Sequence, residues 1–336
     1  MQNHNGEERM KAWQKILIVA VLATIVVIAG TLVYFDYFAR RRLRISTTTS
    51  LYDTGLLDEI TTQYEATHNI DLNIISAGTG IALQQAQSGD ADIVLVHSPS
   101  QEQTFLTNGY GVCRKIIAWN YFTIVGPSSD PAGITGKNAT EALKSIVAFG
   151  RNQTGQTIVW VSRGDNSGTF SKEQSLWTSA GYNQTVISAE SWYATTGSGM
   201  AYTLNVANQK LAYTLSDIGT YLKLSQEGTM SLKSLVSGGK SLLNVYSVMA
   251  VNPAKVSNVS FNDAIDFIKW LVSDTAQQVI SDYGKANYSQ SLFYGAVQPL
   301  KASSPQPDVS WIQSYAFFNG TECPTQYRDD HPELYT

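Results

Sequence analysis

A run of twenty residues without a charged side chain, from Ile16 to Phe35, sets the first limit on how this chain folds. At about 1.5 Å of rise per residue, such a helix is roughly 30 Å long, which matches the apolar core of a bilayer. Signal peptides have shorter apolar regions followed by small residues, whereas Asp36 and Arg40–Arg42 follow here. We therefore predict an uncleaved transmembrane anchor over residues 16–35 after an N-terminal tail over residues 1–15. A cleaved signal peptide is the alternative.

The charges divide the chain into a basic start and an acidic remainder. Residues 1–44 hold seven basic and three acidic residues, which leaves 16 basic and 24 acidic residues and a net charge of -8 for residues 45–336. Such a domain lacks the basic surface of a general nucleic-acid binder. Two Cys and four scattered His do not form a zinc site of the usual spacing. By the positive-inside rule, the four arginines after the span favour a cytoplasmic domain, but that rule weakens for long translocated domains.

Short apolar segments alternate with helical patterns from Leu43 onward. Leu43–Thr47, Asp71–Ala77 and Asp92–His97 are predicted strands, and residues 54–68 and 81–88 between them are predicted helices. The last of these strands is almost continuously apolar, as in a parallel strand that is buried on both faces. The pattern predicts an α/β fold with a mainly parallel sheet.

The alternation continues to about residue 283 without a long linker. Apolar strands are predicted at Trp119–Gly126, Thr157–Ser162 and Leu242–Val251. We therefore predict two interleaved lobes, with crossings at the first and last of these strands. The Pro-rich end of the chain predicts an extended strap over the surface. The predicted parts are lobe 1 over residues 45–120 and 245–300, lobe 2 over residues 121–244, and the C-terminal strap over residues 301–336.

Four turns rich in Ser, Thr and Gly stand directly before predicted helices: Thr47–Ser50, Gly78–Gly80, Ser162–Thr169 and Gly197–Gly199. A helix N-terminus has free backbone N–H groups and a partial positive charge, and hydroxyl groups add further donors. Ser and Thr are also common helix caps without any ligand. In open α/β sheets, however, ligands bind at the carboxyl ends of strands, where several of these turns lie. The turns therefore predict an anion site.

Arg163 adds a positive charge to the third turn. Only four arginines lie beyond residue 44, and this one stands in the turn with the most donors. The alternative for Arg163 is a surface salt bridge with Asp165.

Catalytic motifs are absent from these turns. The segment Gly164–Gly168 is not the G-x-S-x-G turn of hydrolases, and a lone His97 at a strand end is more often structural than a partner for Ser167. Gly136-Lys137 lacks the preceding Gly of a phosphate-binding P-loop. We expect that the protein is not an enzyme.

Five segments in order resemble the tungstate-binding proteins of ABC transporters, the TupA type. They read TTTSLYDTGLLDEI (47–60), GTGIALQQAQSGDADIVLVHS (78–98), NYFTIVGPSSDPAGI (120–134), SRGDNSGTFSKEQSLW (162–177) and WYATTGSGMAYTL (192–204). The resemblance implies a type II periplasmic-binding-protein fold, which has two α/β lobes, a two-strand hinge and an oxyanion held in the cleft between the lobes. The family's TTTS and SRGDxSGT motifs carry oxyanion contacts. The chain departs from the family pattern at Tyr121, Phe170 and Ile218, and beyond residue 300.

The expected ligand is therefore tungstate or molybdate, with no cofactor and no bound metal ion other than the oxyanion itself. The expected partners are an ABC permease and its ATPase, and the expected place is the cell membrane, single-pass, with the domain on the extracytoplasmic side. The predicted ligand-binding residues are Thr48, Thr49, Ser50, Thr79, Gly80, Arg163, Ser167, Gly168, Thr169, Ser198 and Gly199.

Several alternatives stay open. The same module can bind another oxyanion such as sulfate or phosphate, and phosphate keeps a proton near neutral pH, for which Asp165 is the candidate acceptor. Alternatives of another class are a hydrolase and a ligand-sensing ectodomain, although only about fifteen residues precede the span for a cytoplasmic output domain. Cys113 and Cys323 are either a disulfide or two unrelated thiols.

Overall fold

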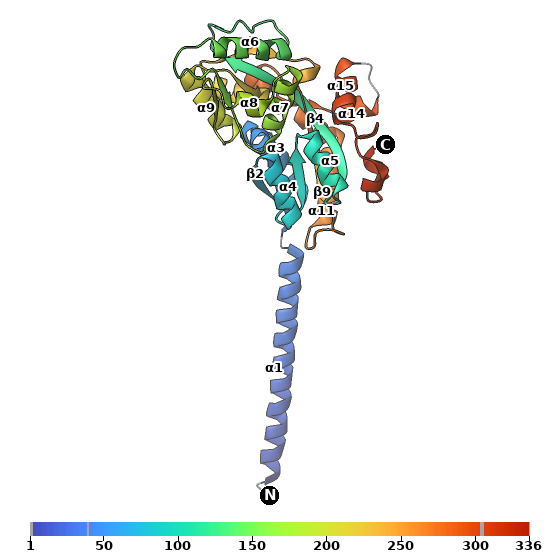
Figure 1. The fold of residues 1–336 in the computed structure, drawn as a ribbon. Helices are drawn as coiled ribbons and strands as arrows, with labels where there is room; N and C mark the ends of the chain where they lie inside the picture. Colours follow the sequence, from blue (N-terminus) through green and yellow to red (C-terminus); the bar gives the residue numbers. More distant parts are fainter. Residues whose placement is uncertain (1–2, 39, 303–305, 336) are drawn as a thin grey trace. The chain divides into compact units, whose positions relative to one another are not determined.

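The computed structural model describes residues 3–38, 40–302 and 306–335. The described chain divides into two compact units (Figure 1). The first unit contains helix α1 (Asn3–Phe38), and the second contains nearly all of the chain after Arg41. Within α1, Trp13–Thr31 is long and apolar enough to cross a membrane, and none of it is buried. Most of the predicted anchor therefore lies in a helix of the expected kind.

The second unit is built on a mixed sheet. The strands are β1 (Arg41–Thr48), β2 (Ile70–Ala77), β3 (Ile93–Val96), β4 (Gly111–Gly126), β5 (Trp160–Ser162), β6 (Tyr193–Thr195), β7 (Thr214–Asp217), β8 (Lys233–Ser237), β9 (Leu243–Val251) and β10 (Tyr294–Gly295). Six of them follow the order β10-β4-β9-β3-β1-β2, while β7 and β8 pair with the far end of β4 and β5 pairs with β6. The prediction of a mainly parallel sheet was wrong. Among the strand pairs with a described register, only β1 with β3 and β5 with β6 are parallel.

Helices pack against strands throughout this unit. They are α2 (Thr49–Thr54), α3 (Leu56–Glu65), α4 (Thr79–Ser88), α5 (Pro99–Thr107), α6 (Ala139–Arg151), α7 (Gly168–Ser179), α8 (Gln184–Ile187), α9 (Met200–Lys210), α10 (Ile218–Gln226), α11 (Phe261–Leu271), α12 (Asp274–Asp282), α13 (Lys285–Tyr288), α14 (Val297–Lys301) and α15 (Pro307–Ala316), with short 3-10 turns at Lys240–Leu242, Thr325–Tyr327 and Pro332–Tyr335. The predicted helix over residues 54–68 is α3, which begins after Gly55. The φ of 85° at Gly55 is left-handed and ends α2.

Strand β4 runs from one lobe into the other. Its residues up to Tyr121 pair with β9, and its residues from Phe122 pair with β7 and β8. The sequence predicted this strand only from Trp119, because Arg114 and Lys115 interrupt the apolar pattern before it. Both of these cations are buried in the structure.

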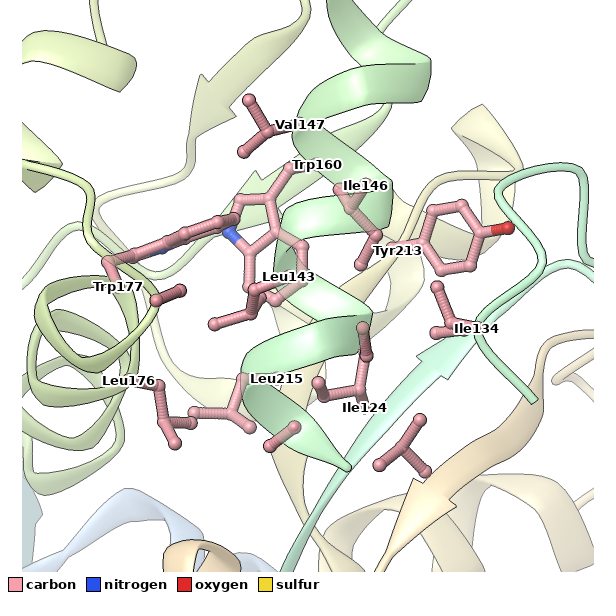
Figure 2. Close-up of a cluster of buried hydrophobic side chains, with 14 of the residues drawn as sticks. Ile124, Ile134, Leu143, Ile146, Val147, Trp160, Leu176, Trp177, Tyr213 and Leu215 are labelled. Carbon is pink, nitrogen blue, oxygen red and sulfur yellow. The ribbon is translucent and has the colours of Figure 1, made fainter. Parts of the chain in front are cut away.

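Separate hydrophobic cores lie on the two sides of this crossing. On the β7 and β8 side, Leu143, Ile146 and Val147 of α6 pack with Trp160, Trp177 and Leu215 (Figure 2). A further cluster there surrounds Met200 and Leu204. On the β3 and β9 side, other clusters form around Phe105 and around Trp119. We use lobe 1 for the side with β1, β3 and β9 and lobe 2 for the side with β5 to β8. The predicted residue limits of the lobes stay a proposal.

The C-terminal part is not the extended strap that the sequence predicted. Residues 307–316 form α15, with Pro307 in its first turn, where the missing N–H of proline costs no helical hydrogen bond. Tyr121 donates a hydrogen bond to Asp308 on this helix. This contact explains how the chain accommodates Tyr at one of its departures from the family pattern. Cys113 and Cys323 are both buried free thiols.

Candidate functional site

The turn after β1 brings the hydroxyl groups of Thr48 and Ser50 into the interior. Thr48 caps α2 and accepts a hydrogen bond from the Leu51 N–H at 3.3 Å. Ser50 Oγ is fully buried and lies 3.3 Å from Thr48 Oγ1. Helix α2 has only six residues, so these hydroxyl groups rather than a helix dipole supply the donors here.

The predicted turn Gly78–Gly80, whose last two residues form the start of α4, faces lobe 2 directly. The backbone N–H of Gly80 donates to the carbonyl of Asn166 at 2.8 Å. A Cβ on Gly80 would lie 1.8 Å from the Asn166 side chain, so a larger residue here would force that exposed side chain to move. The neighbouring Thr79 has a buried hydroxyl with no partner among the described residues. This turn therefore joins the lobes and also holds one spare donor.

The turn before α7 carries the charged group of the site. Arg163 is 2 % exposed, and its Nη2 donates to Asp165 Oδ2 at 2.6 Å and to Thr49 Oγ1 at 3.2 Å. Ser167 donates to Asp165 Oδ1 at 2.5 Å and accepts from the Phe170 N–H as the cap of α7. The salt bridge with Asp165 that was the alternative for Arg163 does exist, but the arginine lies inside the protein and not at its surface.

The carboxyl group of Glu173 fixes the start of this turn through hydrogen bonds. It is buried one helical turn beyond Thr169, and it accepts hydrogen bonds from Ser162 Oγ at 2.8 Å and Trp160 Nε1 at 2.9 Å. Tyr193 and Trp177 donate to the same carboxyl group. Burial raises the pKa of Glu173. The turn is therefore fixed at the residue just before Arg163.

The fourth predicted turn, Gly197–Gly199, lies before α9 and next to the first turn. We call the four turns together the cluster. A Cβ on Gly199 would lie 3.6 Å from Thr49 Oγ1, which places Gly199 beside the first turn. Ser198 is partly buried and bonds locally, since its Oγ donates to the Thr196 carbonyl at 3.3 Å. The structure thus brings residues of all four predicted turns to the boundary between the lobes.

Three of the buried donors in these turns have no hydrogen-bond partner among the described residues. They are Thr79 Oγ1, Arg163 Nε and Thr169 Oγ1. An unpaired polar group in the interior costs about 1–3 kcal/mol, so native proteins seldom leave one without a ligand or a water. The predicted site therefore holds unused donors from both lobes.

His97 also lies among these turns, although a lone histidine at a strand end is more often structural. Its Nε2 lies 3.1 Å from Ser50 Oγ, and its Nδ1 lies 2.8 Å from Asn244 Oδ1. A Cβ on Gly168 would lie 2.8 Å from the same Nε2, so the ring fits between Ser50 and α7. Burial lowers the pKa of His97 to about 4. No signal in the sequence linked this lone histidine to the turns.

Carboxyl groups lie closer to the site than the sequence suggested. Asp165 contacts Arg163 directly, while Asp217 is fully buried and caps α10. Burial raises the pKa of Asp217 to about 6 and also raises that of Asp53. Only one of these three carboxyl groups, that of Asp165, bonds to predicted ligand donors.

Two cavities flank the cluster at the lobe boundary. One of about 400 Å³ is lined by Gly168 and Lys172 together with Ser98 and Tyr315. The other, of about 350 Å³, is lined by Gly80 and Asn166. A cavity of about 490 Å³ between α3 and α12 contains none of the predicted ligand residues. No group of three or more His, Cys, Asp or Glu residues in the described part of the chain is arranged to hold a metal ion.

Comparisons with known proteins agree with this architecture. A PBP superfamily domain matches residues 38–275. The tungstate-binding protein TupA of Peptoclostridium acidaminophilum is 37% identical over 255 residues, which cover 76% of this chain and 86% of that protein.

Two solved structures are similar as well. The tungstate ABC transporter structure from Geobacter sulfurreducens is 40% identical, with a TM-score of 0.65, and the match covers 73% of this chain and 100% of that one. The tungstate-binding protein TupA from Desulfovibrio alaskensis G20 is also 40% identical, with a TM-score of 0.63, over 76% of this chain and 99% of that one. The chain therefore belongs to the PBP superfamily and, within it, to the family of the TupA tungstate-binding proteins.

Proposed function

We propose that this chain is an extracytoplasmic solute-binding protein that captures tungstate between its two lobes and delivers it to an ABC permease with its ATPase. The observation that carries the proposal is the set of buried donors without partners, Thr79 Oγ1, Arg163 Nε and Thr169 Oγ1, which come from both lobes. The relatives named above are tungstate-binding proteins. Molybdate, an oxyanion of the same shape and charge, is a second expected ligand.

A tetrahedral dianion without protons needs donors on all sides, and the eleven predicted ligand residues supply hydroxyl groups, backbone N–H groups and one guanidinium. Each hydrogen bond to a charged group contributes roughly 1.5–3 kcal/mol when water is excluded. Asp165 occupies Arg163 and Ser167 in this structure. In the proposal, the anion takes over these two donors and the Asp165 carboxylate moves aside.

A thermal-shift screen tests the proposal. Full-length protein in mild detergent should melt at a higher temperature with tungstate and molybdate, because a ligand at a hundred times its Kd adds about 2.7 kcal/mol of stability. Sulfate and phosphate are the comparison ligands. Stabilisation by phosphate alone would favour the second candidate, a phosphate receptor in which Asp165 accepts the ligand's proton. No shift with any of the four anions would refute the receptor function.

The membrane part of the proposal rests on α1. The apolar window Trp13–Thr31 supports a membrane-spanning segment. We propose that it is an uncleaved single-pass anchor that keeps the domain at the outer face of the cell membrane. Protease added to intact cells should then remove the domain while α1 stays in the membrane fraction. A cleaved signal sequence would instead give a mature chain that begins after α1.

We further propose that the site is not catalytic. Ser167 and His97, the pair that a hydrolase would need, are not hydrogen-bonded to each other: Ser167 donates to Asp165, and the serine bonded to His97 is Ser50. Ser50 is fully buried and serves as a ligand donor in this proposal. A fluorophosphonate probe should therefore leave the protein unlabelled.

A further inference from the structure

A chain of amide contacts that starts at a backbone carbonyl fixes the hydrogen of the His97 ring. Asn120 Nδ2 donates to the Leu292 carbonyl at 3.1 Å, so Asn120 turns its Oδ1 toward Asn244. Asn244 Nδ2 donates to that oxygen at 2.9 Å and to Tyr246 Oη at 2.8 Å. Asn244 therefore presents its own Oδ1 to His97 Nδ1, and Nδ1 carries the hydrogen.

This tautomer decides what Ser50 can do. In a neutral ring that is protonated on Nδ1, Nε2 has only a lone pair, so it accepts the hydroxyl hydrogen of Ser50 at 3.1 Å. A serine has one hydrogen to donate. While His97 is neutral, that hydrogen is directed at the imidazole, or at Thr48 Oγ1 at 3.3 Å, and it is not available to a ligand.

Burial and two nearby cations favour the neutral form of the ring in this structure. His97 is fully buried, and burial is the main reason that its pKa is low. The hydrogen bond with Asn244 raises this pKa, the positive charges of Arg163 and Lys172 lower it further, and Asp165 raises it. Tyr246 of β9 stacks on the ring at 5.1 Å, and Phe122 of β4 lies 5.9 Å away. A bound dianion adds negative charge beside Ser50 and reverses this balance.

We propose that oxyanion binding is coupled to proton uptake by His97, which converts Ser50 from a donor to the imidazole into a donor to the anion. This inference rests on the proposed function. The proton comes from solvent and binds at Nε2, and the new Nε2–H donates to Ser50 Oγ. The serine hydrogen is then free to point at the ligand. By linkage, the apparent affinity falls as pH rises, by up to about tenfold per pH unit.

Titration calorimetry of the full-length protein in mild detergent measures the coupling directly. Tungstate is injected at one pH in two buffers with different ionisation enthalpies, neither of them phosphate. The expected result is an uptake approaching one proton per tungstate and a Kd that rises with pH. In His97→Gln, the amide nitrogen can donate to Ser50 without a proton, so the uptake should vanish and the pH dependence should flatten.

His68→Gln is the matched control. His68 stacks on Tyr64 of α3 at 4.0 Å, outside the cluster, and this variant should keep the proton uptake of the wild type. Nitrogen-15 NMR of the wild-type imidazoles needs no variant at all. It should report one protonated ring nitrogen in the ligand-free protein and two with tungstate for a single histidine.

The outcomes separate this inference from the function on which it rests. Tungstate binding without proton uptake would overturn the coupling and leave the proposed function standing. Uptake that persists in folded His97→Gln would place the proton on another group, with Asp165 and the buried Asp217 as the nearest candidates, and would also overturn the inference. A wild-type protein that does not bind tungstate would refute both the coupling and the proposed function. If His97→Gln does not fold, the NMR result decides.

Discussion

Two buried arginines show the difference between a structural charge and a site charge. Arg114 in β4 is fully buried; its Nε and Nη2 each lie 2.8 Å from Glu102 Oε2, and its Nη1 lies 2.6 Å from the Glu322 carbonyl. Arg163 makes its side-chain contacts through Nη2 alone, and its Nε has no partner within the described residues. Glu102 is itself fully buried, whereas the Asp165 side chain is 19% exposed. Each arginine keeps one nitrogen without a hydrogen-bond partner among the described residues, Arg114 Nη2 and Arg163 Nε. What differs is the carboxylate. Arg114 is held by a fully buried one, which stabilises the fold, whereas Arg163 is held by a partly exposed one that can move aside for a ligand.

The largest expected effect concerns Arg114. Replacing it by methionine leaves the buried Glu102 carboxylate without its cation, which should cost about 3–5 kcal/mol of unfolding free energy. Urea unfolding of the full-length protein, followed by tryptophan fluorescence, measures this loss. The fraction that folds should bind tungstate with the wild-type Kd. A variant as stable as the wild type would abolish the distinction between the two arginines.

Arg163→Ala should weaken tungstate binding much more than it lowers the stability of the fold. It removes a charged donor from the site, so the Kd for tungstate should rise by about ten- to a hundredfold, near the high end of roughly 1.5–3 kcal/mol. Arg163→Lys should recover only part of the affinity, because an ammonium group cannot reproduce the planar guanidinium. Calorimetric titration of both variants tests this. Near-wild-type binding by Arg163→Ala would place the ligand elsewhere.

Ser167→Ala removes a neutral donor from the same turn and so shows how much of the Arg163 effect is due to its charge. The loss should lie near the low end of roughly 1.5–3 kcal/mol, or about tenfold in Kd. The same change removes the cap of α7, which costs roughly 0.5–2 kcal/mol of stability. Ser273→Ala is the matched control, because Ser273 caps α12 in the same way by accepting from the Ala276 N–H. It should lose stability and keep its affinity.

The smallest expected effect belongs to Asp165→Asn. Removing a carboxylate that competes for Arg163 and repels a dianion should tighten tungstate binding by up to about fivefold, or about 0.2–1 kcal/mol. Phosphate should bind more weakly, because the amide oxygen of Asn is a weaker acceptor for its proton than a carboxylate. Competition titrations against tungstate compare the two anions. Weaker tungstate binding would mean that Asp165 holds Arg163 in its working position.

The sequence predicted those parts of the fold whose signal is local. The continuous apolar runs of β3 and β9 and the polar turns before α4, α7 and α9 lie where the pattern placed them. The first half of β4 was missed because Arg114 and Lys115 look like surface residues until their distant partners are known. The antiparallel pairings were missed for a similar reason, since strand direction depends on the path of the whole chain.

The site was predictable only as far as its turns. Hydroxyl and glycine runs before helices are visible in the sequence, and so is an arginine within one of them. The position of His97 against Ser50 depends on Asn244, which lies 147 residues further along the chain. The hydrogen bond from the Gly80 N–H to the Asn166 carbonyl likewise depends on contact between the two lobes, which a local sequence pattern does not reveal.

The partner of Lys115 has a consequence for how the protein is made. This buried ammonium group of β4 pairs with Glu322, 207 residues later in the chain, and the Ile116 N–H donates to the same carboxylate. During synthesis, the central strand that links both lobes therefore carries an unmatched charge until residue 322 has left the ribosome. An unmatched charge is costly to bury, so the strand cannot settle early. This part of the domain would therefore stay incompletely folded, and competent for export, until residue 322 has been made.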